Sequence, residues 1–384
     1  MIKLVPRLYY TLPTYLYLRS VFIKKNNHNQ LKGYESELQY RFNKARTGLR
    51  FLLSSLSDKP LNIGVQAYTC ETVFRSIKQA GHNIVFLDID QNLSLDKKSL
   101  ASKANNIDAV IVTHTFGFPE DIASIKEIIG DKVIIEDCSH AFLSKHNDNY
   151  VGLMGHAAVF SSGVGKLPSI GSGGLCVINQ AKAFPFIDKE IEQFSKPSLG
   201  SEIISFIKTV ILSVITKPPF YKWVVFKLIK KENKKSIDTD SLNYSESFDY
   251  KWSSKMFFNN FRYFERLVDK RADKAAFFRS KLNSSFRTIS YNNSNEIPNF
   301  FLMPIFVSNR NYYYNLLLNN GIECGKHFKD ALKWATKYGY VNGECANTEL
   351  IINNILVIPI HKIVDTNDLI KITNTLNSNV GEEK

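Results

Sequence analysis

Cysteine is scarce in this sequence, and no two cysteines stand close together. The chain of 384 residues contains only five, namely Cys70, Cys138, Cys176, Cys324 and Cys345. An odd number of scattered cysteines without a CxxC pair argues against a disulfide framework and against a zinc site of the finger type. We therefore expect free thiols, no bound metal and a cytoplasmic protein.

Long apolar runs are absent as well. No uncharged apolar run reaches the roughly 18 residues that a membrane-spanning helix needs. The aromatic and basic N-terminus lacks the apolar segment and the small-residue cleavage site of a signal peptide. The sequence also shows neither zinc-finger spacing nor an RNA-binding aromatic signature, so we expect no nucleic acid as a partner.

The chain is rich in positive charge and has ample apolar residues. A hydrophobic content of 44% suffices for a sizeable core, and the length accommodates two domains. The formal net charge is +13. This balance indicates an anionic partner, either a nucleotide-bearing metabolite or a membrane surface.

Short β-branched runs alternate with helical patterns through the first half of the chain. The predicted buried strands are 63–67, 83–88, 109–113 and 133–137. Their alternation with helices predicts an α/β fold with a mostly parallel sheet covered by helices. Two further predicted strands, 301–307 and 355–360, lie among helical patterns and indicate a smaller α+β domain.

We divide the chain into four parts on these patterns. They are an aromatic and basic arm (1–32), a large cofactor-binding domain (33–186), an apolar and basic insertion (187–247) and a small C-terminal domain (248–384).

The insertion allows two interpretations. Residues 203–216 are apolar except for Lys208 and a stripe of small hydroxyl residues, and residues 217–235 then carry seven lysines, one glutamate and four aromatic residues. Basic and aromatic residues beside an apolar helix are typical of an element at a membrane interface. A buried helix followed by a solvated linker, or a contact between subunits, fits the same pattern.

The most informative stretch runs from Val133 to Cys176. Asp137 ends a predicted buried strand, where an unpaired carboxylate is costly, so a cationic partner is expected. Ser161 ends the next apolar run, and both side chains are expected at the carboxyl edge of the sheet, where ligands bind. Lys166 follows, before glycines that allow the backbone to pass close to a ligand.

These residue types together describe the chemistry of one cofactor. A desolvated lysine with a lowered pKa forms a Schiff base with an aldehyde, an aspartate can pair with a protonated pyridine nitrogen, and a serine can donate to a phosphate. Arg46 and Thr47 stand at the start of an apolar helical stripe, where backbone N–H groups suit a phosphate. The pattern predicts a site for pyridoxal 5'-phosphate.

The same stretch resembles a known family. It reads Glu136-Asp137-Cys138-Ser139-His140, then Phe160-Ser161-Ser162, then Lys166, then Gly171-Ser172-Gly173-Gly174. This order is similar to the central motifs of the DegT/DnrJ/EryC1/StrS sugar aminotransferases, which have the aspartate-aminotransferase-like fold (fold type I). Weaker matches flank it, and the resemblance extends from about Gly33 to Asn377 apart from the insertion.

The resemblance implies a role for each matching residue. Lys166 would bond the cofactor and later shuttle a proton, and Asp137 would keep the pyridine nitrogen protonated. Ser161 and the backbone near Arg46 and Thr47 would hold the phosphate. His140 would lie near the ring and its 3-oxygen, although a buried histidine with satisfied hydrogen bonds is an equally good interpretation of this position.

Several positions depart from the family pattern. The family's phosphate-binding glycine is displaced in the sequence KARTGL, Cys70 replaces an aromatic residue that stacks on the ring, and Ser172 replaces an acid. Asp249 replaces an asparagine that reaches the phosphate of the neighbouring subunit. An aspartate at that place needs a compensating cation, such as Lys251 or another basic residue.

Three functional hypotheses follow. In the first, the protein is an aminotransferase that moves an amino group from an amino acid, glutamate in the first instance, to a keto group of a nucleotide-linked sugar, for surface polysaccharide or lipopolysaccharide synthesis. The resemblance also implies a homodimer. In the second, the altered positions leave a protein that binds without catalysis. The third adds peripheral membrane contact through residues 203–231 and the N-terminal arm, at the inner face of the membrane.

Overall fold

A seven-stranded sheet forms the centre of the molecule. The computed structural model describes residues 4–6, 11–20, 22, 30–217, 220–223, 246–292 and 294–382. The strand order is β1-β9-β8-β5-β4-β2-β3. The strands are β1 (Leu38–Phe42), β2 (Asn62–Gln66), β3 (Asn83–Leu87), β4 (Ala109–Thr113), β5 (Val133–Asp137), β8 (Ala157–Ser161) and β9 (Gly174–Ile178).

The predicted α/β class with a mostly parallel sheet is confirmed. Strand β9 is the exception, because it pairs antiparallel with both β8 and β1. In the parallel pairing of β4 with β5, Thr113 stands opposite Asp137. This register brings the carboxyl ends of neighbouring strands to one edge of the sheet, where the functional side chains were expected.

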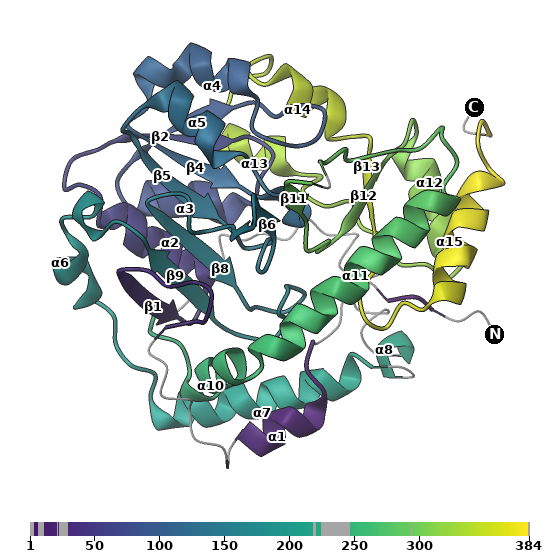
Figure 1. Cartoon of the computed structure of the whole chain (residues 1–384), viewed down its shortest axis with the longest axis horizontal. Coiled ribbons are helices and arrows are strands. Elements are labelled where there is room, and N and C mark those ends of the chain that lie inside the picture. The colour runs from purple at the N-terminus through teal and green to yellow at the C-terminus, as the bar shows by residue number, and fades with distance from the viewer. Residues whose placement is uncertain are drawn as a thin grey trace.

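Helices cover both faces of this sheet, as Figure 1 shows. They include α2 (Ala45–Ser54), α3 (Glu71–Gln79), α4 (Lys97–Lys103), α5 (Ile122–Ile129) and α6 (Ile187–Ile191). Ile111 of β4 belongs to the same buried cluster as Phe74 of α3. Its neighbour Val112 belongs to the cluster that holds Leu100 of α4 and Ile125 of α5. Alternate residues of a strand point to opposite faces, so a wholly apolar strand needs helices on both sides.

The C-terminal part contains a second, three-stranded sheet. Its strands are β10 (Arg287–Thr288), β12 (Met303–Phe306) and β13 (Ile355–Ile358), and α11 (Phe261–Lys281), α12 (Arg310–Asn319) and α15 (Thr366–Asn377) lie in the same region. Helices α13 (Ala331–Lys337) and α14 (Ala346–Ile351) lie beside the large sheet instead (Figure 1). A small third sheet joins β6 (Lys145–His146), β7 (Asn149–Tyr150) and β11 (Glu296–Ile297).

One apolar core connects the two main sheets. Phe160 of the seven-stranded sheet and Ile355 of the three-stranded sheet belong to the same buried cluster. Asp88, just after β3, adds a polar link because its carboxylate accepts hydrogen bonds from the backbone N–H groups of Asn347 and Thr348, at 2.8 Å each. These groups begin α14, so an acid of the first half caps a helix of the second half. The domain boundaries themselves stay a prediction.

The described part of the insertion is mainly helical. Helix α7 (Leu199–Ile215) and the short α8 (Phe220–Trp223) lie beside α1 (Thr14–Ser20) and α10 (Lys251–Asn259) at one edge of the molecule (Figure 1). The part of the predicted membrane segment from 224 to 231 lies outside the described residues. Among the residues that the structure describes, none of the helices combines the length and apolar character that crossing a bilayer requires.

Candidate active site

A cavity of about 350 Å³ opens at the carboxyl edge of the large sheet. Its lining includes Asp137 at the end of β5, Ser161 at the end of β8, and Lys166 in the loop between β8 and β9. His140 and the start of α2 complete the wall. Five of the six residues predicted for the site, the exception being Thr47, therefore line one cavity.

Lys166 has the electrostatic environment of a reactive amine. Burial lowers the pKa of this lysine, and the cation of Arg46 lowers it further, while Cys70 and Asp137 oppose the shift. Its Nζ lies 5.5 Å from the ring centroid of Phe301. A lowered pKa increases the fraction of uncharged amine at neutral pH, which is the nucleophilic form.

The N-terminal arm anchors the loop that carries Lys166. The backbone N–H of Thr11 donates to the carbonyl of Ser169 at 3.0 Å, and the N–H of Ser169 donates to the Thr11 hydroxyl at 2.6 Å. The buried hydroxyl of Tyr17 donates to the carbonyls of Ser169 and Ile170 at 3.4 and 3.2 Å. This stretch of the predicted arm is thus part of the support of the site.

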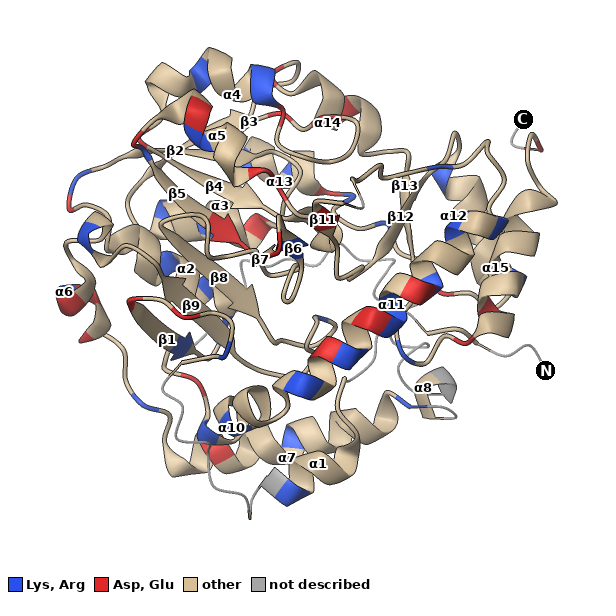
Figure 2. Ribbon diagram, viewed as in Figure 1, with Lys and Arg blue, Asp and Glu red and all other residues tan. Residues whose placement is uncertain are grey.

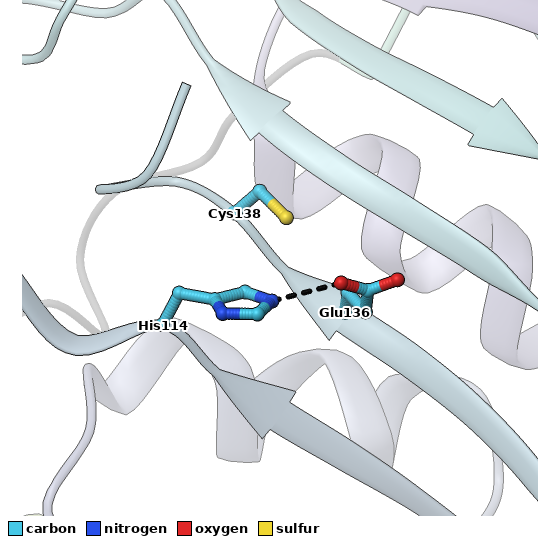
Figure 3. Close-up of side chains that lie close together, drawn as sticks. All are labelled: His114, Glu136 and Cys138. Atoms are coloured by element: carbon cyan, nitrogen blue, oxygen red, sulfur yellow. Dashed lines mark hydrogen bonds and ion pairs between the residues drawn. The ribbon is translucent and has the colours of Figure 1, made fainter. Parts of the chain in front are cut away.

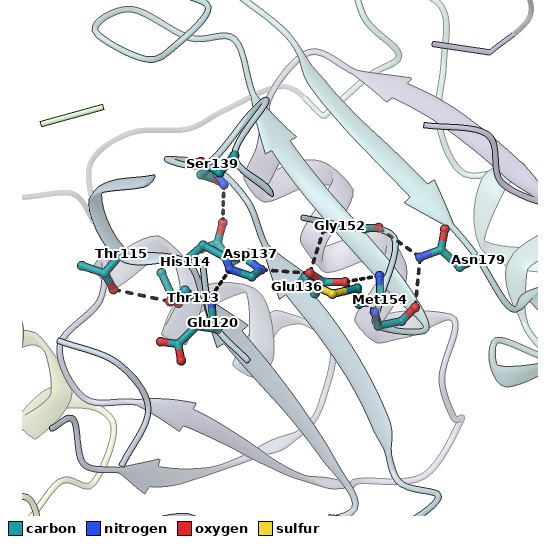
Figure 4. Close-up of polar contacts among 12 residues, drawn as sticks. Thr113, His114, Thr115, Glu120, Glu136, Asp137, Ser139, Gly152, Met154 and Asn179 are labelled. Carbon is teal, nitrogen blue, oxygen red and sulfur yellow. Dashed lines mark hydrogen bonds and ion pairs between the residues drawn. The ribbon is translucent and has the colours of Figure 1, made fainter. Parts of the chain in front are cut away.

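Asp137 is buried beside the cavity and holds a fixed orientation. Its Oδ1 accepts a hydrogen bond from the backbone N–H of Ser139 at 3.0 Å, as Figure 4 shows. Asp137 also contributes to the electrostatic field at Lys166. A carboxylate buried to this degree is stable when a cation pairs with it, which is the property expected of a partner for a protonated ring nitrogen.

His140 fulfils both interpretations that the sequence left open, because it is buried and hydrogen-bonded and also lines the cavity. Its ring stacks on Phe301 with a centroid distance of 4.6 Å, and its Nδ1 accepts a hydrogen bond from the N–H of Phe116 at 3.4 Å. Burial, with contributions from Lys166 and His327, holds the pKa of His140 well below its usual range. The imidazole is therefore neutral, and acceptance at Nδ1 places the proton on Nε2.

The start of α2 forms a cationic end of the cavity. Lys44, Ala45 and Arg46 all line it, and the Lys44 side chain does not cap the helix. Burial lowers the pKa of Lys44, and the neighbouring cations Arg46 and Lys208 add to the effect. Clustered cations at the start of a helix favour an anion here, and a phosphate fits this position.

Thr47 is placed differently from the other predicted residues. Its hydroxyl donates to the Oδ1 of Asn43 at 3.1 Å, its side chain is buried, and it is not part of the cavity wall. Only its backbone N–H stays available to the predicted phosphate contact.

The displaced glycine of KARTGL has a packing reason. A Cβ on Gly48 would lie 2.4 Å from the sulfur of Cys176 and 3.2 Å from a ring carbon of Phe42. Helix α2 therefore approaches β9 and β1 too closely at this point for any side chain. This glycine, displaced from the family's phosphate-binding position, permits contact between a helix and the sheet.

Asp249 forms a buried ion pair with Arg41 of β1. The Nη2 and Nε of Arg41 lie 2.5 and 2.8 Å from the Oδ2 of Asp249, and only 8% and 1% of the two side chains are exposed. The compensating cation is thus Arg41, whereas Lys251 is exposed. A Cβ on Gly173 would lie 2.3 Å from Arg41 Nη2, so this glycine leaves room for the pair.

Three buried residues next to the cavity resemble a metal site in composition. His114, Glu136 and Cys138 are all buried and lie within reach of one ion (Figure 3). However, His114 Nε2 donates to Glu136 at 2.9 Å, and its Nδ1 accepts from the N–H of Glu120 at 2.9 Å. Glu136 also accepts the N–H groups of Gly152, Met154 and Gly155 (Figure 4).

These contacts assign the cluster a structural role. Both ring nitrogens of His114 and both oxygens of Glu136 are engaged, and burial raises the pKa of Cys138 well above its usual range, so its sulfur stays protonated. Burial by itself would raise the pKa of Glu136, but its hydrogen bonds lower it. The carboxylate is thus the acceptor that orders the loop after β7.

We expect Glu136→Gln to lower the free energy of unfolding by about 3 kcal/mol, because the amide group turns a donor toward backbone N–H groups. Since the pKa of Glu136 is lowered, its contribution to stability is present above its unfolded pKa and disappears as pH falls through the folded value. Chemical denaturation across pH measures both effects, with exposed Glu127→Gln as control. A rise of Tm on addition of Zn²⁺ would contradict the structural assignment.

Several residues of the cavity wall, Phe328 and Lys44 among them, were not predicted from the sequence. Phe328 comes from the C-terminal part and adopts a left-handed φ of +53°, and its ring stacks on His140 at 5.7 Å. Lys44 precedes the predicted helix, and only its positive charge could have indicated a place in the site. Cys70 begins α3 and lines the cavity at the position where an aromatic residue was expected.

The cavity fits pyridoxal phosphate by the chemistry of its donors. It combines an amine of lowered pKa, one buried carboxylate, a neutral imidazole and a cationic helix start. Lys166, Asp137 and His140 suit the ring, and Ser161 with the start of α2 suits the phosphate. These individual roles stay predictions.

Among curated proteins, two relatives are GDP-perosamine synthases. The one from Escherichia coli O157:H7 is 32% identical over 108 residues, which is 27% of this chain and 30% of the relative. The one from Vibrio cholerae is 29% identical over 119 residues, covering 30% and 32%. The chain thus aligns with only about a third of the length of the curated relatives it matches.

Solved structures show the same fold over nearly the whole chain. The aminotransferase TlmJ from Streptoalloteichus hindustanus superposes with a TM-score of 0.76 at 14% identity, with all of both chains covered. GDP-4-keto-6-deoxy-D-mannose-3-dehydratase from E. coli, solved with bound hydrated pyridoxal phosphate, also gives 0.76, at 18% identity over 98% of this chain and 100% of that one.

The family comparison covers most of the chain. The sequence model of the DegT/DnrJ/EryC1/StrS aminotransferase family matches residues 47–200 and 251–377. The unmatched interval between them contains most of α7, whereas Asp137, Ser161 and Lys166 lie inside the matched region and Lys44 and Arg46 just before it. The chain belongs to the DegT/DnrJ/EryC1/StrS aminotransferase family.

Proposed function

We propose that this protein is a pyridoxal-phosphate-dependent aminotransferase that moves an amino group from an amino acid to a keto group of a nucleotide-linked sugar. The observation that supports this most is the presence of Lys166, Asp137 and the cationic start of α2 around one cavity. A binding protein without catalysis would not need an amine whose pKa burial lowers.

The side chains have separable tasks in this proposal. Bound pyridoxal phosphate supplies an electron sink for the carbon next to the amino group. Lys166 Nζ takes the proton from that carbon of the donor, and returns a proton on the acceptor side. Asp137 holds a positive charge at the ring nitrogen, and neutral His140 offers its Nε2 proton as a hydrogen-bond donor toward the ring.

The sugar substrate is the finer part of the proposal. The curated relatives are named GDP-perosamine synthases, which supports a nucleotide-linked keto sugar as acceptor and GDP as the first nucleotide to test. The net charge of +13 suits a substrate that carries a diphosphate. We further propose glutamate as donor, a homodimer, a role in surface polysaccharide or lipopolysaccharide synthesis, and a cytoplasmic location, in keeping with five free cysteines.

The donor half of the reaction can be tested without knowing the sugar. Incubation of the protein, loaded with pyridoxal phosphate, with L-glutamate should release 2-oxoglutarate in about one equivalent per chain and change the visible absorption. Addition of a GDP-linked keto sugar should then restore the original spectrum and yield an amino sugar.

The alternative makes a different prediction for the same experiment. A protein that binds the cofactor without catalysis would give the spectrum of the bound form but no 2-oxoglutarate. Lack of any cofactor binding at saturating pyridoxal phosphate would refute both. Aspartate and glutamine in place of glutamate serve as matched donors.

A further inference from the structure

Helix α7 has the reverse of the usual arrangement of polar and apolar residues. Its small hydroxyl residues Thr209 and Ser213 are buried, whereas Ile203, Ile207 and Ile211 are 50%, 52% and 55% exposed. A helix that packs on a protein core normally buries its apolar stripe and exposes the polar one. Here the apolar stripe points away from the body of the protein.

The inner side of α7 makes hydrogen bonds and ring contacts with neighbouring helices. The Ser213 hydroxyl donates to the Thr14 hydroxyl of α1 at 3.0 Å, and Lys217 Nζ donates to the same oxygen at 2.6 Å. Phe206 packs against Trp252 of α10 with ring centroids 6.0 Å apart. The orientation of α7 is therefore fixed by these contacts, so the exposure of its isoleucines is a property of the folded chain.

Helix α1 extends the apolar stripe. Tyr15 and Leu18 are exposed on α1, which contacts α7 through Thr14. We call the exposed side chains Tyr15, Leu18, Ile203, Ile204, Ile207 and Ile211 the α1–α7 face. Other exposed large apolar side chains of the described residues, such as Val341 and Leu350, lie elsewhere. Several exposed apolar side chains on two contacting helices are typical of an interaction site.

The charges on this face are mostly positive. Arg19 of α1 and Lys208 of α7 are exposed, and Lys217 follows the end of α7. Figure 2 shows both helices as largely uncharged ribbons with isolated basic positions. The one acid of α7, Glu202, accepts a hydrogen bond from the backbone N–H of Lys251 at 2.8 Å, at the end of the helix away from Lys217.

We propose that the α1–α7 face docks on the surface of an anionic phospholipid bilayer. Its apolar side chains would enter the boundary between headgroups and acyl chains, and the exposed Arg19 and Lys208 would contact the phosphates. A lysine that stands among isoleucines suits such a boundary, because its stem lies along apolar surface while its ammonium reaches the headgroups. The polar inner stripe of α7 indicates a helix that lies in the plane of the bilayer.

A second copy of the chain fits this face less well. A two-fold contact would bring the same basic residues from both copies together, with few acids among the described residues of α1 and α7 to pair with them. Anionic headgroups supply the complementary charge. The isoleucines of this face also lie outside the residues 47–200 and 251–377 that match the family.

The experiment uses the full chain, loaded with pyridoxal phosphate, in vesicle flotation. We expect the protein to float with phosphatidylcholine vesicles that contain about one quarter phosphatidylglycerol, and to stay in the soluble fraction with pure phosphatidylcholine. Raising the salt concentration should weaken flotation because it screens the headgroup charge. The double variant Ile207→Glu/Ile211→Glu should reduce partitioning about tenfold or more.

The controls separate this proposal from folding and from catalysis. Leu350→Glu changes an apolar side chain that is 71% exposed on α14, and it should float like the unchanged protein. Lys166→Ala should also float normally, because docking does not use the cavity. The proposal is wrong if the unchanged protein ignores anionic vesicles, or if Ile207→Glu/Ile211→Glu floats equally well. It is also wrong if that variant only changes the molecular mass in solution, which would make the face a subunit contact.

Discussion

Lys166→Ala should lower the rate of amino transfer about a thousandfold or more, because it removes both the amine that bonds the cofactor and the group that moves the proton. Visible absorption that borohydride abolishes in the unchanged protein should be missing from the variant. The release of 2-oxoglutarate from glutamate measures the rate without any sugar. The cavity itself should stay intact, since the loop is held through Thr11, Tyr17 and Ser169 rather than through the lysine.

Lys166→Arg sharpens this experiment. Arginine keeps the positive charge but has no amine that is uncharged near neutral pH, so it should be as inactive as alanine. Exposed Lys182→Ala is the matched control and should keep full activity. Because the pKa of Lys166 is lowered, the rate of cofactor binding should rise with pH and level off below the usual titration range of lysine. Substantial transfer by either variant at position 166 would remove the central assignment.

Arg41→Met should lower the free energy of unfolding by about 3 to 5 kcal/mol at neutral pH, because it leaves the carboxylate of Asp249 buried without a partner. Only 1% of the Asp249 side chain is exposed, so water cannot replace the guanidinium. Denaturant unfolding, followed by tryptophan fluorescence and circular dichroism, measures the loss. A loss of less than about 1 kcal/mol in the free energy of unfolding would show that the buried carboxylate of Asp249 does not depend on Arg41.

The double variant Arg41→Met/Asp249→Asn tests the cause of that loss. Removing the charge should recover most of the stability, which a double-mutant cycle quantifies. Burial raises the pKa of Asp249, and Arg41 opposes that shift. In Arg41→Met the deficit should therefore be fully present above the folded pKa and shrink as pH falls and Asp249 takes up a proton. A deficit that is independent of pH would point to lost packing of Arg41 on Phe257 instead.

The Arg41–Asp249 pair also changes what the departure at position 249 means. The sequence raised the prospect of an aspartate that repels a phosphate, with Lys251 as one possible compensation. In the folded chain the carboxylate points to Arg41 of the same chain, 208 residues away in sequence. Asp249 is thus paired with a cation of its own chain. The cavity wall is lined by the cations Lys44 and Arg46.

Local patterns were sufficient for the fold class and for naming residues that line one cavity. The β-branched runs at 109–113 and 133–137 are strands with those same bounds, because a strand covered by helices on both faces must be apolar throughout. Asp137, Ser161 and Lys166 were found because each follows a strand end or lies in the next loop, and parallel strands bring their ends to one edge.

Patterns of this kind cannot show which distant residues meet. Phe328 and the arm residue Tyr17 support the site from opposite ends of the chain, and no spacing rule connects them with Lys166. The meaning of Gly48 was also beyond reach, since it depends on the distance from α2 to Cys176.

By itself, the sequence determined the α/β class, the order of the central motifs and the residue types that suit pyridoxal phosphate. Only the tertiary structure decided that Arg41 neutralises Asp249, that His114 and Glu136 hold a loop instead of a metal, and that α7 exposes its isoleucines. The physical reason is that motifs depend on neighbours along the chain, whereas pairing of charges, satisfaction of buried hydrogen bonds and the direction of a helix face depend on neighbours in space.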